Sequence, residues 1–143
     1  MDLLRHAIVH PEVRPSDLDL ILMAADSSIT YRTRYLTALK SPYVLDLLLF
    51  DESNPRSVAY QLVSLAELCA KLPQQESTST WSLEKRLAVK PLSSLRLTGP
   101  EEIDDRDNLA RLLNQLGEDL SDLSDALTGR YLSHVMPSRF ASL

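Results

Sequence analysis

The sequence predicts an all-α protein: an antiparallel, up-and-down helix bundle of four to five helices, forming one domain over residues 1–143. Leucine recurs at spacings of three and four residues along several stretches, which is the period of a helix with one buried face. Only Gly99, Gly117 and Gly129 are available for tight turns, too few for a β-rich fold of this length. A composition of 44% hydrophobic and 24% charged residues is typical of a globular chain.

The first strong helix is predicted from Ser16 to about Lys40, after an ambiguous segment over residues 1–15 that contains two helix-breaking prolines. Ser16 is a candidate N-cap, and Asp17 and Asp19 suit the positive end of the helix dipole. The expected inward stripe holds one charged member, Arg32, among apolar ones: Leu18, Leu22, Ala25, Ile29, Arg32, Leu36 and Leu39.

Two further helices are predicted where a capping residue precedes a proline. Ser41-Pro42 opens the short apolar helix YVLDLLLF, which we expect to be buried. Asn54-Pro55 opens a helix that ends at Leu72. The buried face of that helix is expected to hold Val58, Leu62, Leu65, Cys69 and Leu72.

The second half of the chain is predicted to hold a linker over residues 74–80, a helix over 81–89 broken or kinked by Pro91, and a loop over 98–104. The last helix is expected over residues 105–134. Its core stripe is Leu109, Leu113, Leu116, Leu120, Leu123 and Leu127. We interpret the acidic side chains on its other faces, namely Glu118, Asp119, Asp122 and Asp125, as a solvated surface.

The charge, the apolar runs and the cysteine content of the chain argue against several classes of function. The net charge of −5 argues against general nucleic-acid binding, which depends on lysine and arginine neutralising phosphates. The longest apolar run is too short to span a membrane, and no leader is recognisable, so we expect a cytoplasmic chain. Cys69, the single cysteine, cannot form an internal disulfide and is expected to be a buried structural thiol.

The first polar cluster consists of Asp26, Ser28, Tyr31, Arg32, Arg34 and Tyr35. One interpretation is a binding site in which a planar arginine fork holds a carboxylate or phosphate, flanked by tyrosine hydroxyls. The other is a buried Arg32 locked to Asp46 or Asp51, which fixes helix packing, because a buried unpaired charge is very costly. The pattern favours the structural interpretation.

The second polar cluster is Asn54, Arg56 and Ser57, at a predicted helix N-terminus, where free N–H groups and the helix dipole attract anions. An ordinary N-cap beside an exposed arginine explains it more simply. If both clusters lie on one side of the bundle, three arginines would converge there.

Metal and enzyme motifs are weak. His6 and His10 have helical i, i+4 spacing but lack an evident third ligand, and His134 is interpreted as interacting with a helix C-terminus. The sequence has no glycine-rich phosphate loop, nucleophile elbow or zinc-protease motif. We therefore expect no metal and no cofactor, and catalysis by this chain alone is not predicted.

Three strings together resemble the bacterial alpha-E family, an α-helical domain of unknown function named for a Glu-Arg motif near its N-terminus. They are DSSITYRTRYL (26–36), VLDLLLFDESNPRSVAYQL (44–62) and LSDALTGRYLSH (123–134). The resemblance covers only the C-terminal half of the family domain, so we expect a portion of a larger alpha-E domain. Members occur beside, or fused to, circularly permuted ATP-grasp proteins and transglutaminase-like proteins, which implies a role in ATP-dependent peptide or amide ligation.

Three functional hypotheses follow. The first is a non-catalytic accessory module that interacts with an ATP-grasp ligase or a transglutaminase-like protein. The second is part of an enzyme active site in which Arg32, Arg34 and Arg56 hold an anionic peptide or phosphate group. The third is an adaptor or dimerisation bundle without a ligand. In each case we expect apolar stripes left uncovered in this portion to be buried by self-association as a dimer.

Overall fold

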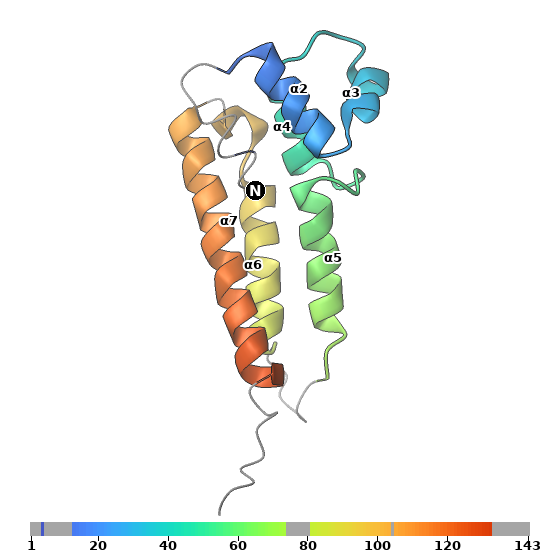
Figure 1. Cartoon of the computed structure of the whole chain (residues 1–143). Helices are drawn as coiled ribbons and strands as arrows, with labels where there is room; N and C mark the ends of the chain where they lie inside the picture. Colours follow the sequence, from blue (N-terminus) through green and yellow to red (C-terminus); the bar gives the residue numbers. More distant parts are fainter. Residues whose placement is uncertain (1–3, 5–12, 74–80, 104, 133–143) are drawn as a thin grey trace, which may run out of the picture.

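The computed structural model describes Leu4 and residues 13–73, 81–103 and 105–132, and these ranges contain helices and no strand (Figure 1). The all-α prediction is confirmed. The α-helices are α2 (Pro15–Ala24), α3 (Ser28–Tyr35), α4 (Ser41–Leu45), α5 (Val58–Ala70), α6 (Leu83–Leu97) and α7 (Arg106–Leu127). Shorter helical turns are η1 (Asp46–Phe50), η2 (Pro100–Ile103) and η3 (Thr128–Leu132).

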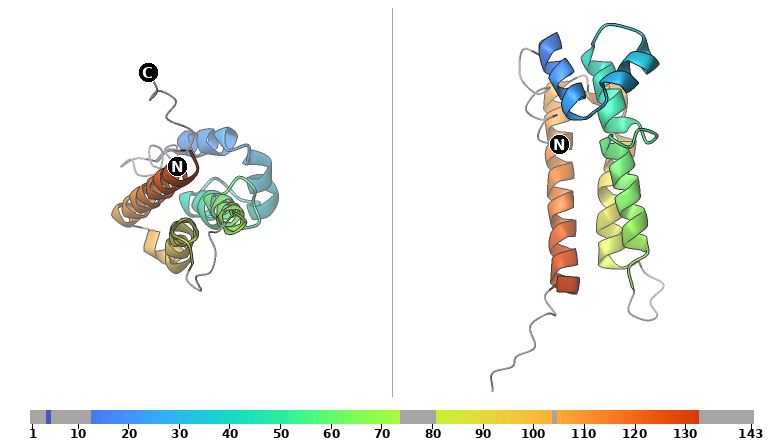
Figure 2. Two further views of the ribbon diagram at one scale, coloured as in Figure 1. Left: turned by 90° about the horizontal axis from the view of Figure 1, so that it is seen from below. Right: turned by 45° about the vertical axis from the view of Figure 1, so that its right-hand side comes forward.

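The helices divide into a long shaft and a cap. In the shaft, α5, α6 and α7 run side by side in alternating directions, and α6 packs against both of the others (Figures 1 and 2). In the cap, the shorter helices α2, α3 and α4 gather at one end of the shaft, where η1 leads into α5 (Figure 2). No described helix is both long enough and apolar enough to cross a bilayer.

The buried core is continuous from the cap into the adjoining half of the shaft. It joins Leu22 and Tyr31 of the cap to the almost wholly apolar run through η1 and to Leu62, Leu95 and Leu113 of the three long helices. A second, small cluster lies farther along the shaft and consists of Cys69, Ala88 and Leu123 with half-buried neighbours. The prediction that YVLDLLLF is buried is largely confirmed, although Tyr43 and Asp46 face solvent.

The predicted single helix over residues 16–40 is wrong, because the chain turns at Ala25 and Asp26. Asp26 adopts a left-handed conformation with φ 51°, and the Ser27 amide donates to the Leu22 carbonyl 2.8 Å away. Helix α3 is therefore a separate element that packs against α2, and the predicted stripe does not continue. Ile29 is 80% exposed and Leu36 is 85% exposed, whereas Leu18 and Leu22 are buried as expected. Helix α2 begins at Pro15 rather than after Ser16.

The predicted start of the next helix at Asn54-Pro55 is also wrong. Residues 51–57 form a loop, here called the 51–57 loop, and α5 begins only after Ser57. The Ser57 hydroxyl accepts from the Tyr60 amide at 3.0 Å and so acts as the N-cap. On the helix itself, Leu62 and Cys69 are buried and Val58 and Leu65 are half-buried, as predicted.

Pro91 does not end the helix in which it lies. Helix α6 begins after the N-cap Ser82 and passes through Pro91 to Leu97. A proline inside a helix removes one hydrogen bond and costs about 3 kcal/mol. Pro91 is fully buried in a helix packed between α5 and α7, so tertiary packing outweighs that local cost.

The last helix agrees with the prediction for the described residues. Helix α7 is capped by Asp105, runs to Leu127 and continues as the turn η3 to Leu132. Residues 133–134 of the predicted helix, the 74–80 linker and the three histidines lie outside the described residues. The predicted loop over 98–104 contains the short helix η2.

Candidate functional site

The two predicted polar clusters meet at the cap, because the 51–57 loop lies against both ends of α3. Arg34, near the C-terminal end of α3, forms an ion pair with Asp51 and donates to the Ser53 hydroxyl at 3.2 Å. Arg56 reaches Asp26, just before α3, with Nη2 2.9 Å from Oδ2. Two of the three arginines expected to converge are thus each paired with a carboxylate.

The Arg34–Asp51 pair is the more enclosed of the two. Asp51 also accepts from the backbone N–H of Ser53 at 2.9 Å and from its hydroxyl at 2.7 Å. Burial raises the pKa of the Asp51 carboxyl, but the hydrogen bonds from Ser53 and Arg34 outweigh burial and the net pKa is lowered. The hydrogen bond to Asp51 raises the pKa of Arg34. This arrangement keeps both charges at neutral pH and orders the loop.

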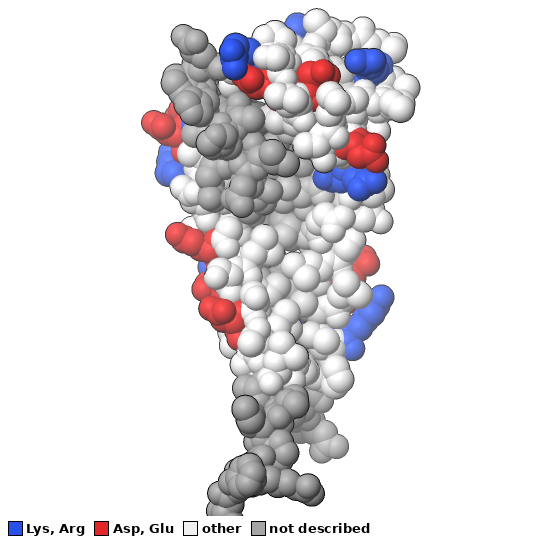
Figure 3. Space-filling model, viewed as in Figure 1, with Lys and Arg blue, Asp and Glu red and all other residues white. Residues whose placement is uncertain are grey.

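The Arg56–Asp26 pair is a surface contact. The two side chains are 59% and 80% exposed, so the pair contributes about 0–1 kcal/mol to stability. Figure 3 shows that acidic and basic side chains on the viewed face are interspersed and do not gather into one basic patch.

The tyrosine hydroxyls of the cluster are already used in packing. Tyr31 is buried, donates to the Ala38 carbonyl at 3.0 Å and accepts from the Lys40 amide at 3.2 Å, which fixes the segment after α3. Tyr35 stacks on Tyr43 and donates to Asp46. Burial, and then the carboxylate of Asp46, raises the pKa of Tyr35 above its ordinary value.

Asn54 also has a structural role. Its side-chain amide donates to the Leu47 carbonyl at 2.9 Å, and its side-chain oxygen accepts from the Arg56 amide at 3.1 Å. These bonds satisfy a buried polar residue and shape the turn that precedes α5.

Arg32 differs from the other two arginines. The interpretation that Arg32 is buried and locked to Asp46 or Asp51 is wrong, because the Arg32 side chain is exposed and those carboxylates bond to Tyr35 and Arg34. Arg32 points toward α2 because α3 folds back after the Asp26 turn. Its guanidinium makes no ion pair or hydrogen bond with any described residue.

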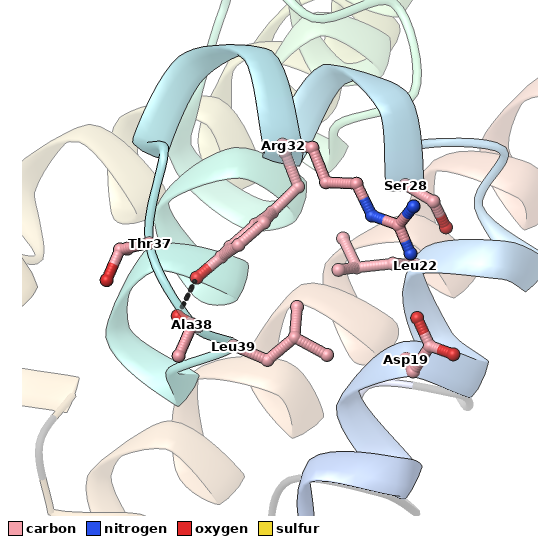
Figure 4. Close-up of a pocket in the computed structure, with 8 residues that line it drawn as sticks. Asp19, Leu22, Ser28, Arg32, Thr37, Ala38 and Leu39 are labelled. Carbon is pink, nitrogen blue, oxygen red and sulfur yellow. Dashed lines mark hydrogen bonds between the residues drawn. The ribbon is translucent and has the colours of Figure 1, made fainter.

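The pocket beside Arg32 is the best candidate site in the described part of the chain (Figure 4). It has a volume of about 140 Å³ and lies between α2, α3 and the segment after α3. The hydroxyl of Ser28 is buried and has no hydrogen-bond partner among the described residues. The lining residues are Asp19, Leu22, Ser28, Tyr31, Arg32, Thr37, Ala38 and Leu39.

The pocket therefore unites Ser28, Tyr31 and Arg32 of the predicted site with residues that sequence reasoning did not assign to it. From the sequence alone, Asp19 is only a favourable charge in the first turn of a helix. Asp19 and Arg32 are 13 residues apart, a spacing that does not indicate a shared site on one continuous helix. They line the same pocket only because the chain turns between α2 and α3.

Three other ion pairs connect elements of the shaft and the loop. Lys90 of α6 pairs with Asp119 of α7 at 2.7 Å, and Arg130 pairs with the buried Glu84 at 2.7 Å. Arg96 forms a two-pronged bond to Glu52 of the 51–57 loop, at 2.6 and 2.9 Å. The interpretation of Asp119 as a solvated surface charge is wrong, because its side chain is fully buried. No group of potential metal ligands occurs among the described residues.

Fold and site together define, for the described residues, an all-α domain with an ion-paired cap and a small pocket beside Arg32. The chain belongs to the alpha-E family: the family model, described as a predicted alpha-helical domain with a conserved ER motif, matches residues 1–132. The chain itself contains no Glu-Arg dipeptide.

Similar proteins are known from mycobacteria. An uncharacterized protein of Mycobacterium tuberculosis is 32% identical over 130 residues, which cover 87% of this chain and 14% of that protein. An uncharacterized protein of Mycobacterium bovis matches with the same values. The chain thus spans about a seventh of the length of the curated relatives it matches. No solved structure matches.

Proposed function

We propose that this chain is a non-catalytic interaction module of an ATP-grasp-linked peptide or amide ligation system, and that it docks on its partner through the cap. The observation that carries this proposal is the set of large apolar side chains that α2 and α3 expose. Leu20 and Met23 of α2 are each 63% exposed, Ile29 of α3 is 80% exposed, and Leu36 at the end of α3 is 85% exposed.

Single exposed apolar residues are normal on protein surfaces, but these four come from two short helices that pack together. Fully burying one such side chain contributes about 1.5–3 kcal/mol, so a partner that covers two or three of them gains substantial binding energy. Association with ATP-grasp proteins, which the family resemblance implies, names the partner class.

Leu36 adds an independent argument. Its backbone is left-handed, with φ 48°, a conformation that costs a leucine about 1–2 kcal/mol. The side chain gains almost no burial within this chain in return. A strained residue that presents an apolar side chain to solvent fits a contact completed by another molecule.

The test is ATP turnover by the ATP-grasp ligase of the same organism, measured with and without this chain added in trans. We expect the chain to change turnover, and Met23→Asp or Ile29→Asp to remove the change without lowering the melting temperature. Leu68→Asp on α5 is the matched control, since Leu68 is 61% exposed and lies outside the cap. Unchanged turnover together with no physical association would contradict the proposal.

A second copy of the chain is the competing occupant of the cap surface. Sedimentation of the wild-type chain and of Met23→Asp separates the two cases. A dimer that Met23→Asp converts to a monomer, with ATP turnover unaffected, would assign the cap to self-association rather than to a ligase.

A second candidate function is the binding of an anionic peptide or phosphate group, favoured by the guanidinium of Arg32, which bonds to no described residue. Arg34 and Arg56 would first have to leave Asp51 and Asp26 to take part. A thermal-shift screen with phosphate, ATP and acidic dipeptides tests this function, because a ligand stabilises the folded state by RT ln(1 + [L]/Kd). A shift that Arg32→Ala abolishes would support it, and no shift with any of these anions would contradict it.

A further inference from the structure

The pocket in Figure 4 holds two opposite charges on facing walls. Arg32 extends from α3 and Asp19 from α2, and both side chains point toward the space between the helices. The two side chains form no ion pair with each other. Neither has another ionic partner among the described residues.

The remaining walls of the pocket carry hydroxyl-bearing and apolar side chains. The Ser28 oxygen also borders the pocket, but it is buried and has no hydrogen-bond partner among the described residues, so a ligand reaches it only if the pocket wall shifts. Leu22 and Leu39 line the pocket with apolar surface.

The size of the pocket limits the ligand. A cavity of about 150 Å³ accommodates benzene, a molecule of six heavy atoms, in a well-known engineered protein. The present volume of about 140 Å³ therefore fits a ligand of roughly six heavy atoms, with room for more only through the open side. A nucleotide is far too large to be enclosed.

We propose that this pocket binds the zwitterionic head of a small α-amino acid. The carboxylate lies against the planar guanidinium of Arg32, and the ammonium group donates to Asp19. A plain anion such as phosphate is disfavoured, because it would pair with Arg32 but be repelled by Asp19. This inference rests on the second candidate function but narrows its anionic ligand to a carboxylate that carries a neighbouring ammonium group, and it does not depend on docking through the cap.

The experiment is a titration of the isotope-labelled full chain followed by two-dimensional NMR, with L-alanine, acetate, methylammonium and inorganic phosphate as probes. We expect L-alanine to shift the backbone resonances of residues 19–39 at millimolar concentration, and to bind at least about tenfold more tightly than acetate or methylammonium. Tenfold is the smallest gain expected when a second charge-assisted hydrogen bond is added.

Variants then separate the two charges. Arg32→Gln should weaken L-alanine and acetate alike, by about tenfold or more. Asp19→Asn should weaken L-alanine but strengthen acetate and phosphate, because it removes the repulsion. Both residues lie at the surface or are half-buried, so the variants are expected to fold. Arg86→Gln and Asp125→Asn, exposed residues outside the pocket, are the matched controls and should change nothing.

The outcomes are distinct. If phosphate binds more tightly than L-alanine and Asp19→Asn does not weaken L-alanine, the zwitterion proposal is overturned while anion binding by Arg32 stands. If no probe shifts any resonance of residues 19–39, both the proposal and the second candidate function are overturned.

Discussion

Lys90 and Asp119 join α6 to α7 through one buried carboxylate. The lysine Nζ lies 2.7 Å from Asp119 Oδ1, and Gln115 donates to the same oxygen at 3.0 Å. The second carboxylate oxygen, Oδ2, is buried and has no partner among the described residues. The Asp119 side chain is fully buried, whereas that of Lys90 is 51% exposed. Only the carboxylate of this pair is therefore enclosed between α6 and α7.

Removing the cation alone should therefore be more harmful than removing both charges. Lys90→Met leaves the buried Asp119 carboxylate with Gln115 as its remaining partner among the described residues. We expect the free energy of unfolding to fall by about 2 kcal/mol. This is less than the cost of breaking a fully buried pair, because Lys90 is half exposed. The double variant Lys90→Met/Asp119→Leu should recover most of that loss. Urea unfolding followed by circular dichroism measures both. If Lys90→Met leaves the free energy of unfolding unchanged, the pair does not hold the two helices together.

Glu84 should make stability depend on pH in the acid range. The hydrogen bond from Arg130 lowers the Glu84 pKa below its ordinary value of 4.5, despite the opposing effect of burial. The folded state thus binds the proton less readily than the unfolded state. The stabilisation is complete above about pH 4.5 and is lost as pH falls through the lowered pKa.

Glu84→Gln should accordingly flatten the acid limb of the stability curve, measured by unfolding between neutral pH and pH 3. Glu67→Gln is the control, because Glu67 is exposed and forms no ion pair or hydrogen bond with another described residue. Equal slopes in the wild type and Glu84→Gln would contradict the prediction.

Cys69 should react slowly in the folded protein. Its side chain is buried in the small cluster with Ala88 and Leu123, and burial raises the thiol pKa. Both effects lower the concentration of accessible thiolate, the reactive species. Mass spectrometry should show slow modification by iodoacetamide in buffer and rapid modification in urea. Equal rates would mean that this part of the shaft opens readily.

Leu36→Gly should stabilise the free chain. Glycine adopts the left-handed conformation without the steric cost that leucine carries, and little burial is lost because Leu36 is 85% exposed. The greater flexibility of glycine in the unfolded state offsets part of the gain, so we expect up to about 1 kcal/mol. Thermal unfolding measures the change, and Leu36→Ala, which keeps a Cβ atom, should show no such gain.

The same variant should weaken docking if the cap binds a partner as proposed. A gain in stability combined with a loss of association would be the expected trade between the two properties at a contact residue. Destabilisation by Leu36→Gly would instead show that the leucine packs within the chain.

The spacing of apolar residues predicts the long helices of the shaft well, but it predicts the short helices of the cap poorly. Helix α7 follows its leucine spacing over six turns, and no other arrangement satisfies that spacing. In the cap, Ile29 and Leu36 continue the stripe of α2 by position alone, so the turn at Asp26 was hidden. The polar run Asp26-Ser27-Ser28, typical of turns and helix caps, was the available indication of a break.

Asp119 illustrates a different kind of error. It occupies the i+3 position after Leu116 and the i−4 position before Leu123, which is a core position on α7. Acidic neighbours at 118 and 122 made it resemble a solvated face. That interpretation gives more weight to the acidic side chain of Asp119 than to its spacing from the leucines. The proximity of Lys90 in the folded chain shows how the buried carboxylate is accommodated.

The uneven core has a consequence for how the molecule opens. Most buried residues lie in the cap and the adjoining half of the shaft, whereas the far end relies on Cys69, Ala88, Leu123 and their half-buried neighbours. Local opening is easiest where buried contacts are fewest. Amide hydrogens of α7 should then exchange with deuterium fastest around Leu127 and slowest around Leu113. The bundle would therefore begin to unfold at the end opposite the cap, and the cap and its pocket would be the last part of the molecule to unfold.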